Sequence, residues 1–278
     1  MNSKVKRVIQ HLLVNDGSWF ALTPFIYLSR RLEASRVNYK NRKSEVENLV
    51  LCKKIFKEET VLHGIFKGMK YAGVHATGSS VYAKLLGSYE SEISHSLQNL
   101  LKKEYSILIN IGCDEGYYAV GIAMHFPKLK VYAFDCNKKA QERCNTLARL
   151  NNVTNNISVS GCFDIAQLPN WDEKTKSLFI IDCEGCENEI FTARLVAASK
   201  HADLIIELHY QVNPEVLSKL QSIFYATHKL TLINALSDHE RVMNYKFDEL
   251  DNLSYQQKDF ILNERNGFMQ WLIAEAFS

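Results

Sequence analysis

Residues 106–135 have the sequence SILINIGCDEGYYAVGIAMHFPKLKVYAFD, in which an apolar run, a turn with two glycines, a helical segment and a second apolar run follow one another. Short apolar runs that alternate with helical segments are typical of buried parallel strands covered by helices on both faces. Further apolar runs lie at 156–161, 177–182, 203–209 and 229–234, and the helical segments at 116–125, 138–150, 187–199 and 214–225. A last run, 268–274, follows a loop, and we expect it to enter the sheet antiparallel. The pattern therefore predicts an α/β fold with a mostly parallel sheet.

The composition is that of an ordinary folded protein. The chain has 278 residues, of which 46% are hydrophobic, and 33 Lys and Arg stand against 31 Asp and Glu, for a formal net charge of +2. This length suffices for one large domain, or for one domain with an extension. The near-neutral charge gives no field that would draw the chain to nucleic acid, so we expect no nucleic-acid partner.

The first hundred residues differ from the rest. Segments 4–14, 27–36 and 43–56 have helical spacing, residues 63–71 (HGIFKGMKY) suit a short hairpin, and helical spacing returns at 85–101. We therefore predict two domains: a mostly helical N-terminal extension, 1–103, that caps a sheet domain, 104–278. Basic residues near the N-terminus leave peripheral membrane contact open as an alternative to simple solvation; they are Lys4, Lys6, Arg7, Arg30 and Arg31.

The cysteines and the N-terminus bear on the compartment. Because the seven cysteines are odd in number and several lie in apolar runs, we expect free, buried thiols in a reducing environment. No apolar signal region follows the first basic residues. The longest apolar stretch near the N-terminus, 19–28, is about half the length of a membrane span. We expect a cytoplasmic protein without a transmembrane segment.

Ligands of open parallel sheets bind beyond the carboxyl ends of the strands. The first predicted strand ends in a turn with Gly112 and Gly116, which is neither a nicotinamide fingerprint nor a Walker loop. The second ends in Asp135, whose carboxylate can accept both hydrogen bonds of a ribose diol. The alternative for Asp135 is a helix N-cap, since a helical segment follows. The third is followed by Asp164, which suits either an adenine amino group or a simple turn.

The fourth and fifth strand ends are rich in ionisable side chains. Residues 180–191 (IIDCEGCENEIF) place Asp182, Glu184 and Glu187 at the end of a buried strand, where carboxylates need compensation by a ligand, hydrogen bonds or a cation. A helix N-terminus would also accommodate Glu187. In the same segment Cys183 and Cys186 are expected to be packing thiols, since a lone C-x-x-C is poor evidence for zinc.

In the fifth strand, IIELH (205–209), alternation places Glu207 and His209 on one side. With a pKa near neutral, His209 suits a general base for a substrate hydroxyl, and a hydrogen-bonded structural histidine is the alternative.

Residues 106–274 resemble the class I S-adenosylmethionine-dependent methyltransferases, and more narrowly the FkbM-type family. The resemblance rests on INIGCDEGYYAVGIA (109–123), AFDCN (133–137), the D-x-E-G-x-E element of IIDCEGCENEIF (180–191) and IIELH (205–209). Upstream, GIFKGMKY (64–71) and KLLGSYESEI (84–93) are similar to what precedes this domain in relatives from bacterial surface-polysaccharide clusters. The resemblance implies a Rossmann-like methyltransferase sheet.

The resemblance also implies roles for single residues. Gly112 and Gly116 would flank the methionine part of S-adenosylmethionine, Asp135 would bind its ribose and Asp164 its adenine. Asp182 and Glu184 would lie where cofactor and methyl acceptor meet.

Other positions match the family less closely. Tyr89 and Glu90 match a Tyr-Glu pair of the family and are included among the cofactor-binding candidates. Two positions depart from the pattern: Asn110 stands where Asp is common, and Asp114 replaces a small residue. We expect a weakened, not a lost, cofactor contact at Asn110.

The resulting expectation is an O-methyltransferase that acts on a hydroxyl of a sugar, a glycan or a related small metabolite, with His209 or Asp182 taking the proton and Glu184 beside them. A catalytically degenerate binding or scaffold protein is the alternative, and a nicotinamide oxidoreductase a weaker one. Asp182, Glu184 and Glu187 could also hold magnesium. Cofactor hydrogen bonds explain these carboxylates without a metal, so no metal is predicted.

Overall fold

The computed structural model describes residues 3–71, 80–168, 174–264, 267 and 269–277. By its internal contacts the chain divides into two compact units, Met1–Lys54 and Ile55–Ser278. The second unit therefore begins well before residue 104, where we predicted the start of the sheet domain. The reason is that described residues before 104 contact the rest of the sheet unit, notably through a buried ion pair between Lys84 and Glu115.

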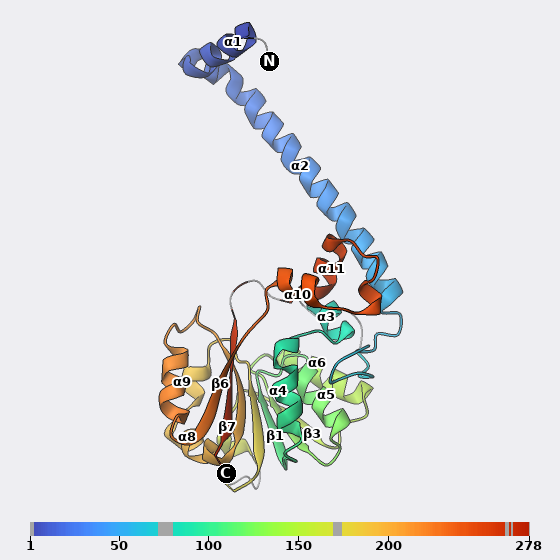
Figure 1. Ribbon diagram of the computed structural model, residues 1–278, viewed down its shortest axis with the longest axis vertical. Coiled ribbons are helices and arrows are strands. Elements are labelled where there is room, and N and C mark those ends of the chain that lie inside the picture. Colours follow the sequence, from blue (N-terminus) through green and yellow to red (C-terminus); the bar gives the residue numbers. More distant parts are fainter. Residues whose placement is uncertain (1–2, 72–79, 169–173, 265–266, 268, 278) are drawn as a thin grey trace. The chain divides into compact units, whose positions relative to one another are not determined.

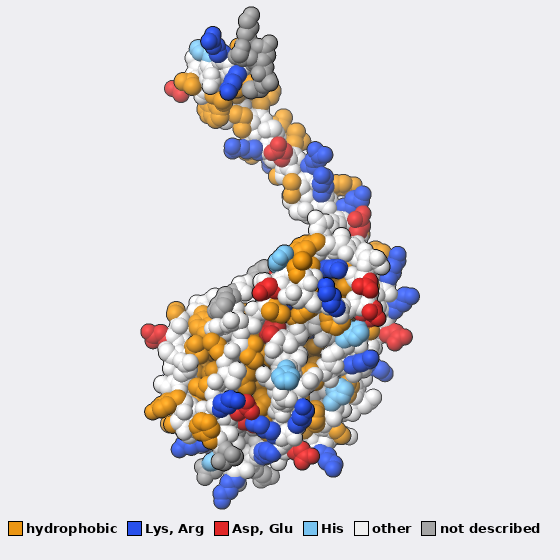
Figure 2. Space-filling model, in the orientation of Figure 1, with side chains coloured by type: hydrophobic (Ala, Val, Ile, Leu, Met, Phe, Trp, Pro, Cys, Tyr) orange, Lys and Arg blue, Asp and Glu red, His pale blue; other side chains and the backbone are white. Residues whose placement is uncertain are grey.

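The described part of the first unit is helical. Helix α1 spans Ser3–Val14, and the segments predicted as separate helices at 27–36 and 43–56 both lie in one long helix, α2 (Asp16–Ile55; Figure 1). Figure 2 shows apolar side chains on the surface of this unit among lysines and arginines. The most exposed of them include Val14, Phe20 and Phe25. Within the described residues, no helix is both long and apolar enough to span a membrane.

Seven strands of the described chain form one sheet in the order β3-β2-β1-β4-β5-β7-β6. The strands β1 to β5 are parallel, and β7 pairs antiparallel with both β5 and β6. This confirms the predicted Rossmann-like methyltransferase sheet with an antiparallel last strand. The strands are β1 (Ile107–Ile111), β2 (Lys130–Phe134), β3 (Ile157–Ser160), β4 (Ser177–Ile181), β5 (Asp203–Leu208), β6 (His228–Asn234) and β7 (Gln270–Ala276).

The central strands β1, β4 and β5 are buried along their whole length, which explains their mostly apolar sequence. Helices lie on both faces of the sheet (Figure 1). They are α4 (Ser91–Leu101), α5 (Tyr117–His125), α6 (Lys138–Leu150), α7 (Glu187–Ile190), α8 (Ala193–Ala198) and α9 (Val216–Phe224), with short 3-10 turns at Ile165–Gln167 and Ser199–His201. The predicted helix 187–199 is interrupted, because the hydroxyl of Thr192 accepts a hydrogen bond from the Leu195 amide (3.4 Å) and starts a new helix there.

Further elements lie around residues 55–103 and 235–264. An antiparallel bridge joins Lys70, in the segment 63–71 that we predicted as a hairpin, to Thr60, three residues before that segment. The helix predicted at 85–101 is instead two helices, because Gly87, with a φ of +86°, ends the first. The two are α3 (Val81–Leu86) and α4, and the sequence did not predict α10 (Asp238–Asn244), α11 (Tyr255–Leu262) or the 3-10 turn Asp248–Leu250.

Gly112 holds the ends of three strands together. Its amide donates to the carbonyl of Phe134 at the end of β2 (2.8 Å), and the amide of Asp182 after β4 donates to Ile111 (2.9 Å). Gly112 has a φ of +76°, and a Cβ atom there would lie 1.6 Å from the carbonyl oxygen of Asp182. No side chain fits at this position, so the closeness of the β1 and β4 ends depends on glycine.

We expect Gly112→Ala to destabilise the protein by about 3 kcal/mol or more, since it adds left-handed strain to an overlap with backbone atoms. Gly161→Ala is the matched control: a Cβ there meets nothing within 4 Å. Urea unfolding followed by circular dichroism measures both. Equal stability of the two variants would contradict this account of Gly112.

Candidate functional site

A cavity of about 1280 Å³ opens at the carboxyl ends of the parallel strands. Most of the residues predicted for the site line it, while Gly116 and Glu90 are not among its lining residues. The predicted residues that line it are Tyr89, Asn110, Gly112, Asp135, Asp164, Asp182, Glu184 and His209. The fold therefore brings together side chains that are up to 120 positions apart in the sequence, from Tyr89 to His209.

Asn110 and Gly116 hold the turn after β1 in different ways. The amide nitrogen of the buried Asn110 side chain donates to the Ile180 carbonyl of β4 (3.2 Å). Its oxygen, Oδ1, is buried and has no hydrogen-bond partner within the described chain. Gly116 precedes α5 in the left-handed conformation, and a Cβ atom there would lie 2.7 Å from the sulfur of Cys144 in α6. Gly116 thus permits close packing of α5 and α6, whereas Asn110 offers an acceptor atom.

Asp135 lies at the end of β2 with both carboxylate oxygens engaged. The oxygens accept hydrogen bonds from the backbone amides of Asp114 (2.9 Å) and Asn137 (2.8 Å). The N-cap of α6 is Asn137, whose side chain accepts from the Lys139 amide (2.9 Å). The alternative of Asp135 as the N-cap is therefore wrong, and its half-buried carboxylate is fixed at the cavity wall.

Asp164 has the role in a turn that we considered as one of its two alternatives. Its side chain accepts a hydrogen bond from the amide of Ala166 (2.9 Å) and caps the 3-10 turn after β3. It also lines the cavity, on the same side as Asp135. Asp164 stays a candidate for contact with a ligand, because a carboxylate that caps a turn can accept further hydrogen bonds.

Glu115 and Lys84 form a buried ion pair that the sequence did not reveal. The Glu115 carboxylate also accepts a hydrogen bond from the hydroxyl of Tyr71. Burial raises the pKa of Glu115, but the charge of Lys84 and these hydrogen bonds outweigh burial and hold that pKa well below its usual value. The Lys84 ammonium also lies 4.6 Å from the ring centre of Tyr89, so it orders one wall of the cavity.

Glu90 makes structural hydrogen bonds near the cavity wall formed by Lys84 and Tyr89. Its carboxylate accepts a hydrogen bond from Tyr118, and its amide donates to the buried carboxylate of Glu264 (3.1 Å). Glu264 in turn pairs with Arg241 (3.1 Å), a second buried ion pair that the sequence did not reveal. The structure gives Glu90 these partners, and it stays only a prediction that Glu90 contacts a cofactor.

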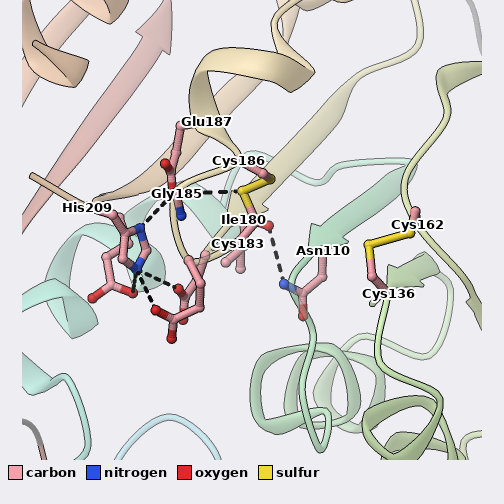
Figure 3. Close-up of a disulfide and its surroundings, with 12 residues drawn as sticks. Asn110, Cys136, Cys162, Ile180, Cys183, Gly185, Cys186, Glu187 and His209 are labelled. Atoms are coloured by element: carbon pink, nitrogen blue, oxygen red, sulfur yellow. Dashed lines mark hydrogen bonds and ion pairs between the residues drawn. A yellow bond between two sulfur atoms is a disulfide. The ribbon is translucent and has the colours of Figure 1, made fainter. Parts of the chain in front are cut away.

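The most polar corner of the cavity surrounds His209, at the end of β5 (Figure 3). Its Nδ1 lies 2.6 Å from the carboxylate of the fully buried Glu187. Its Nε2 lies 3.5 Å from Asp182, 3.5 Å from Glu184 and 3.8 Å from Glu207. Burial lowers the pKa of His209, but the bond to Glu187 and the surrounding carboxylates prevail and raise that pKa.

Donor atoms of Asp182, Glu207 and His209 lie within 4.8 Å of one another. Sequence alternation put Glu207 on the same side as His209, but did not single it out as a site residue. The signal in the sequence was a glutamate within an apolar run, two positions before the histidine that ends it.

The cysteines differ from the prediction of free thiols. The described residues contain two disulfides, Cys136–Cys162 and Cys183–Cys186 (Figure 3), while Cys52, Cys113 and Cys144 are free and buried. The first joins the adjacent ends of β2 and β3, with Cα atoms 4.4 Å apart. The second closes a tight turn in which Glu184 and Gly185 have positive φ angles and the Cα atoms are 5.4 Å apart. Apolar periodicity cannot reveal such neighbours, because they depend on strand order and turn geometry.

Comparison with known proteins finds no family model and no curated protein that matches the chain. Several solved structures are similar to it. The MccD protein is 16% identical, with 66% of this chain and 95% of that chain covered and a TM-score of 0.39. An rRNA methylase from Streptococcus thermophilus is 14% identical, with 67% and 97% covered and a TM-score of 0.45. Precorrin-6y C5,15-methyltransferase from Geobacter metallireducens is 12% identical, with 66% and 89% covered and a TM-score of 0.43.

We expect Lys84→Met to cost about 3–5 kcal/mol of stability, because it leaves the Glu115 carboxylate buried without its cation. The double variant Lys84→Met, Glu115→Gln should recover much of this loss. Lys102→Met is the control, since Lys102 is exposed, and should change stability by no more than about 0.5 kcal/mol. Urea unfolding measures the three variants. A Lys84→Met protein as stable as the wild type would show that the pair does not hold the cavity wall.

Proposed function

We propose that this protein is an S-adenosylmethionine-dependent O-methyltransferase of the FkbM type. Its acceptor would be a hydroxyl of a sugar, a glycan or a related small metabolite, and it would act in the cytoplasm. The observation that carries the proposal is the cavity at the carboxyl ends of β1, β2, β4 and β5, which has hydrogen-bond acceptors along one wall and a histidine among carboxylates at the other. This is the side of an open parallel sheet where a nucleoside ligand and an acceptor can meet.

The β1–β3 side of the cavity suits the cofactor. The Asp135 carboxylate is held by two backbone amides in a position to accept hydrogen bonds from a ribose diol. Asp164 also lines the cavity and would bind the adenine amino group. The Oδ1 atom of Asn110 is a buried acceptor that suits the ammonium group of the methionine part. Because Gly112 has no side chain, only its backbone lies beside Asn110.

The β4–β5 side suits the methyl acceptor. In the proposed reaction the acceptor oxygen attacks the methyl carbon, the carbon–sulfur bond breaks, and the electron pair stays on sulfur as a neutral thioether. The hydroxyl proton passes to a base, for which Asp182 and His209 are the candidates with their side chains at the cavity. Because the sulfonium already activates the methyl group, positioning supplies most of the acceleration, up to about 7–11 kcal/mol in well-oriented systems.

Small or glycan acceptors fit better than nucleic acid. The formal net charge of the chain is +2. Among the residues that line the cavity, the one lysine is Lys84, which is paired with Glu115, and no arginine is present in the described lining. A phosphate backbone needs several free cations along its path.

The test is isothermal titration of the full chain with S-adenosylmethionine and, separately, with NAD. We expect micromolar binding of S-adenosylmethionine, no binding of NAD, and at least about tenfold weaker binding by Asp135→Ala, which corresponds to about 1.4 kcal/mol. Asp135→Asn retains one acceptor oxygen for the turn and should show an intermediate loss.

Asp251→Ala is the control, because Asp251 is exposed and does not line the cavity. Circular dichroism of each variant separates a lost contact from a lost fold. Absence of S-adenosylmethionine binding by the wild type would overturn the proposal and favour a binding or scaffold role. Undiminished affinity of Asp135→Ala would overturn the role given to that residue.

A further inference from the structure

We propose that Asp182, Glu207 and His209 form a binding site for a divalent metal ion, with manganese(II) as the ion whose ligand preferences fit best. This goes against the prediction of no metal. The inference deepens the proposed function, on which it rests for what the ion would do, but metal binding itself can be measured without cofactor or acceptor.

The orientation of His209 is the first argument. The side chain is 5% exposed, and its Nδ1 lies 2.6 Å from the Glu187 carboxylate, whose side chain is 1% exposed. A carboxylate that holds one ring nitrogen of a histidine fixes the ring so that the other nitrogen can bind a metal. That other nitrogen, Nε2, is buried, faces three carboxylates and has no hydrogen-bond partner among the residues that the structure describes. The ring is therefore set in the way that metal-binding histidines are set.

The separation of the donor atoms is the second argument. Ligands at about 2.1 Å from one ion in an octahedral arrangement stand about 3 Å apart when adjacent and about 4.2 Å apart when opposite. Nε2 of His209 lies 3.5 Å from Asp182 Oδ1 and 3.8 Å from Glu207 Oε2. Both distances are shorter than the separation of opposite ligands, so one ion could reach both atoms after small side-chain shifts, and both are too long for good hydrogen bonds. Three protein ligands leave positions open toward the cavity, which Asp182 and His209 line.

The balance of charge is the third argument. Around His209 stand four carboxylates, and two of them, Glu187 and Glu207, are completely buried. His209 is the one imidazole among these four carboxyl groups. Lys84, the lysine of the described cavity lining, is already paired with Glu115. Buried carboxylates require compensation, and a divalent ion supplies two charges at the point where the donors converge.

The donor set selects the class of ion. Two carboxylates suit magnesium, calcium and manganese, whereas imidazole suits first-row transition metals. Manganese(II) accepts both. Its open positions would bind the acceptor hydroxyl and lower the pKa of that oxygen. The proton would then leave to Glu184, whose side chain is 87% exposed and lies beside the donor set. In this arrangement His209 and Asp182 are both ligands, and neither of them is the base.

The experiment titrates manganese(II) alone into the full chain after treatment with EDTA, and follows the loss of the free-ion signal by electron paramagnetic resonance. We expect one ion per chain in the wild type, and at least tenfold weaker binding by Glu207→Gln and by His209→Gln. Glu189→Gln is the matched control, since Glu189 is an exposed glutamate that lines the same cavity; it should bind as the wild type does.

Thermal unfolding keeps the test falsifiable if a variant folds poorly. Without metal, the unfolding temperature of Glu207→Gln shows whether the variant folds like the wild type. Added manganese(II) should raise the unfolding temperature of the wild type and not that of Glu207→Gln. No binding by the wild type, or equal binding by the wild type, Glu207→Gln and Glu189→Gln, would overturn the site.

The two proposals fail separately. Asp135→Ala should lose S-adenosylmethionine and keep manganese(II). Binding of S-adenosylmethionine by a wild type that takes up no manganese(II) would overturn the metal site and leave the methyltransferase proposal standing. The reverse pattern would overturn the methyltransferase proposal and leave the metal site.

Discussion

The close approach of two backbones at Gly112 is the constraint on which the cavity depends. Strands β1 and β4 are neighbours in the sheet, and the chain continues from β1 to α5 and from β4 to α7. Because Gly112 has no side chain, the carbonyl of Asp182 lies directly against it. The two strand ends can therefore carry polar groups, Asn110 and Asp182, to the floor of one cavity. Any larger residue at position 112 would push these groups apart.

Buried charge is handled in two different ways around the cavity. At the wall formed by Lys84 and Glu115, opposite charges neutralise each other and a tyrosine hydroxyl completes the hydrogen bonds. At the end of β5, four carboxylates surround one imidazole. The closed ion pair is a structural device, whereas the carboxylates around His209 supply the donors of the proposed metal site.

The sequence predicted the sheet well and the contacts at its edge less well. Buried strands such as β1 and β4 can be recognised by their mostly apolar runs, since both faces of these strands are covered. The break at Thr192 was missed because a cap within an otherwise helical stretch changes one hydrogen bond and not the periodicity. Ion pairs such as Lys84 with Glu115 were not predicted, because they join residues of separate elements. For Asp135 the sequence left two roles open, and the hydrogen bonds of Asn137 excluded one of them.

The two disulfides lie in the lining of the same cavity, one beside Asp135 and one beside Asp182. In a reducing compartment these four cysteines would be thiols, whereas purification in air favours the bonded form. A preparation of this protein is therefore defined by its thiol content as well as by its sequence. Affinities measured with and without reductant belong to different chemical species, and a thiol assay of each sample is needed before the two are compared.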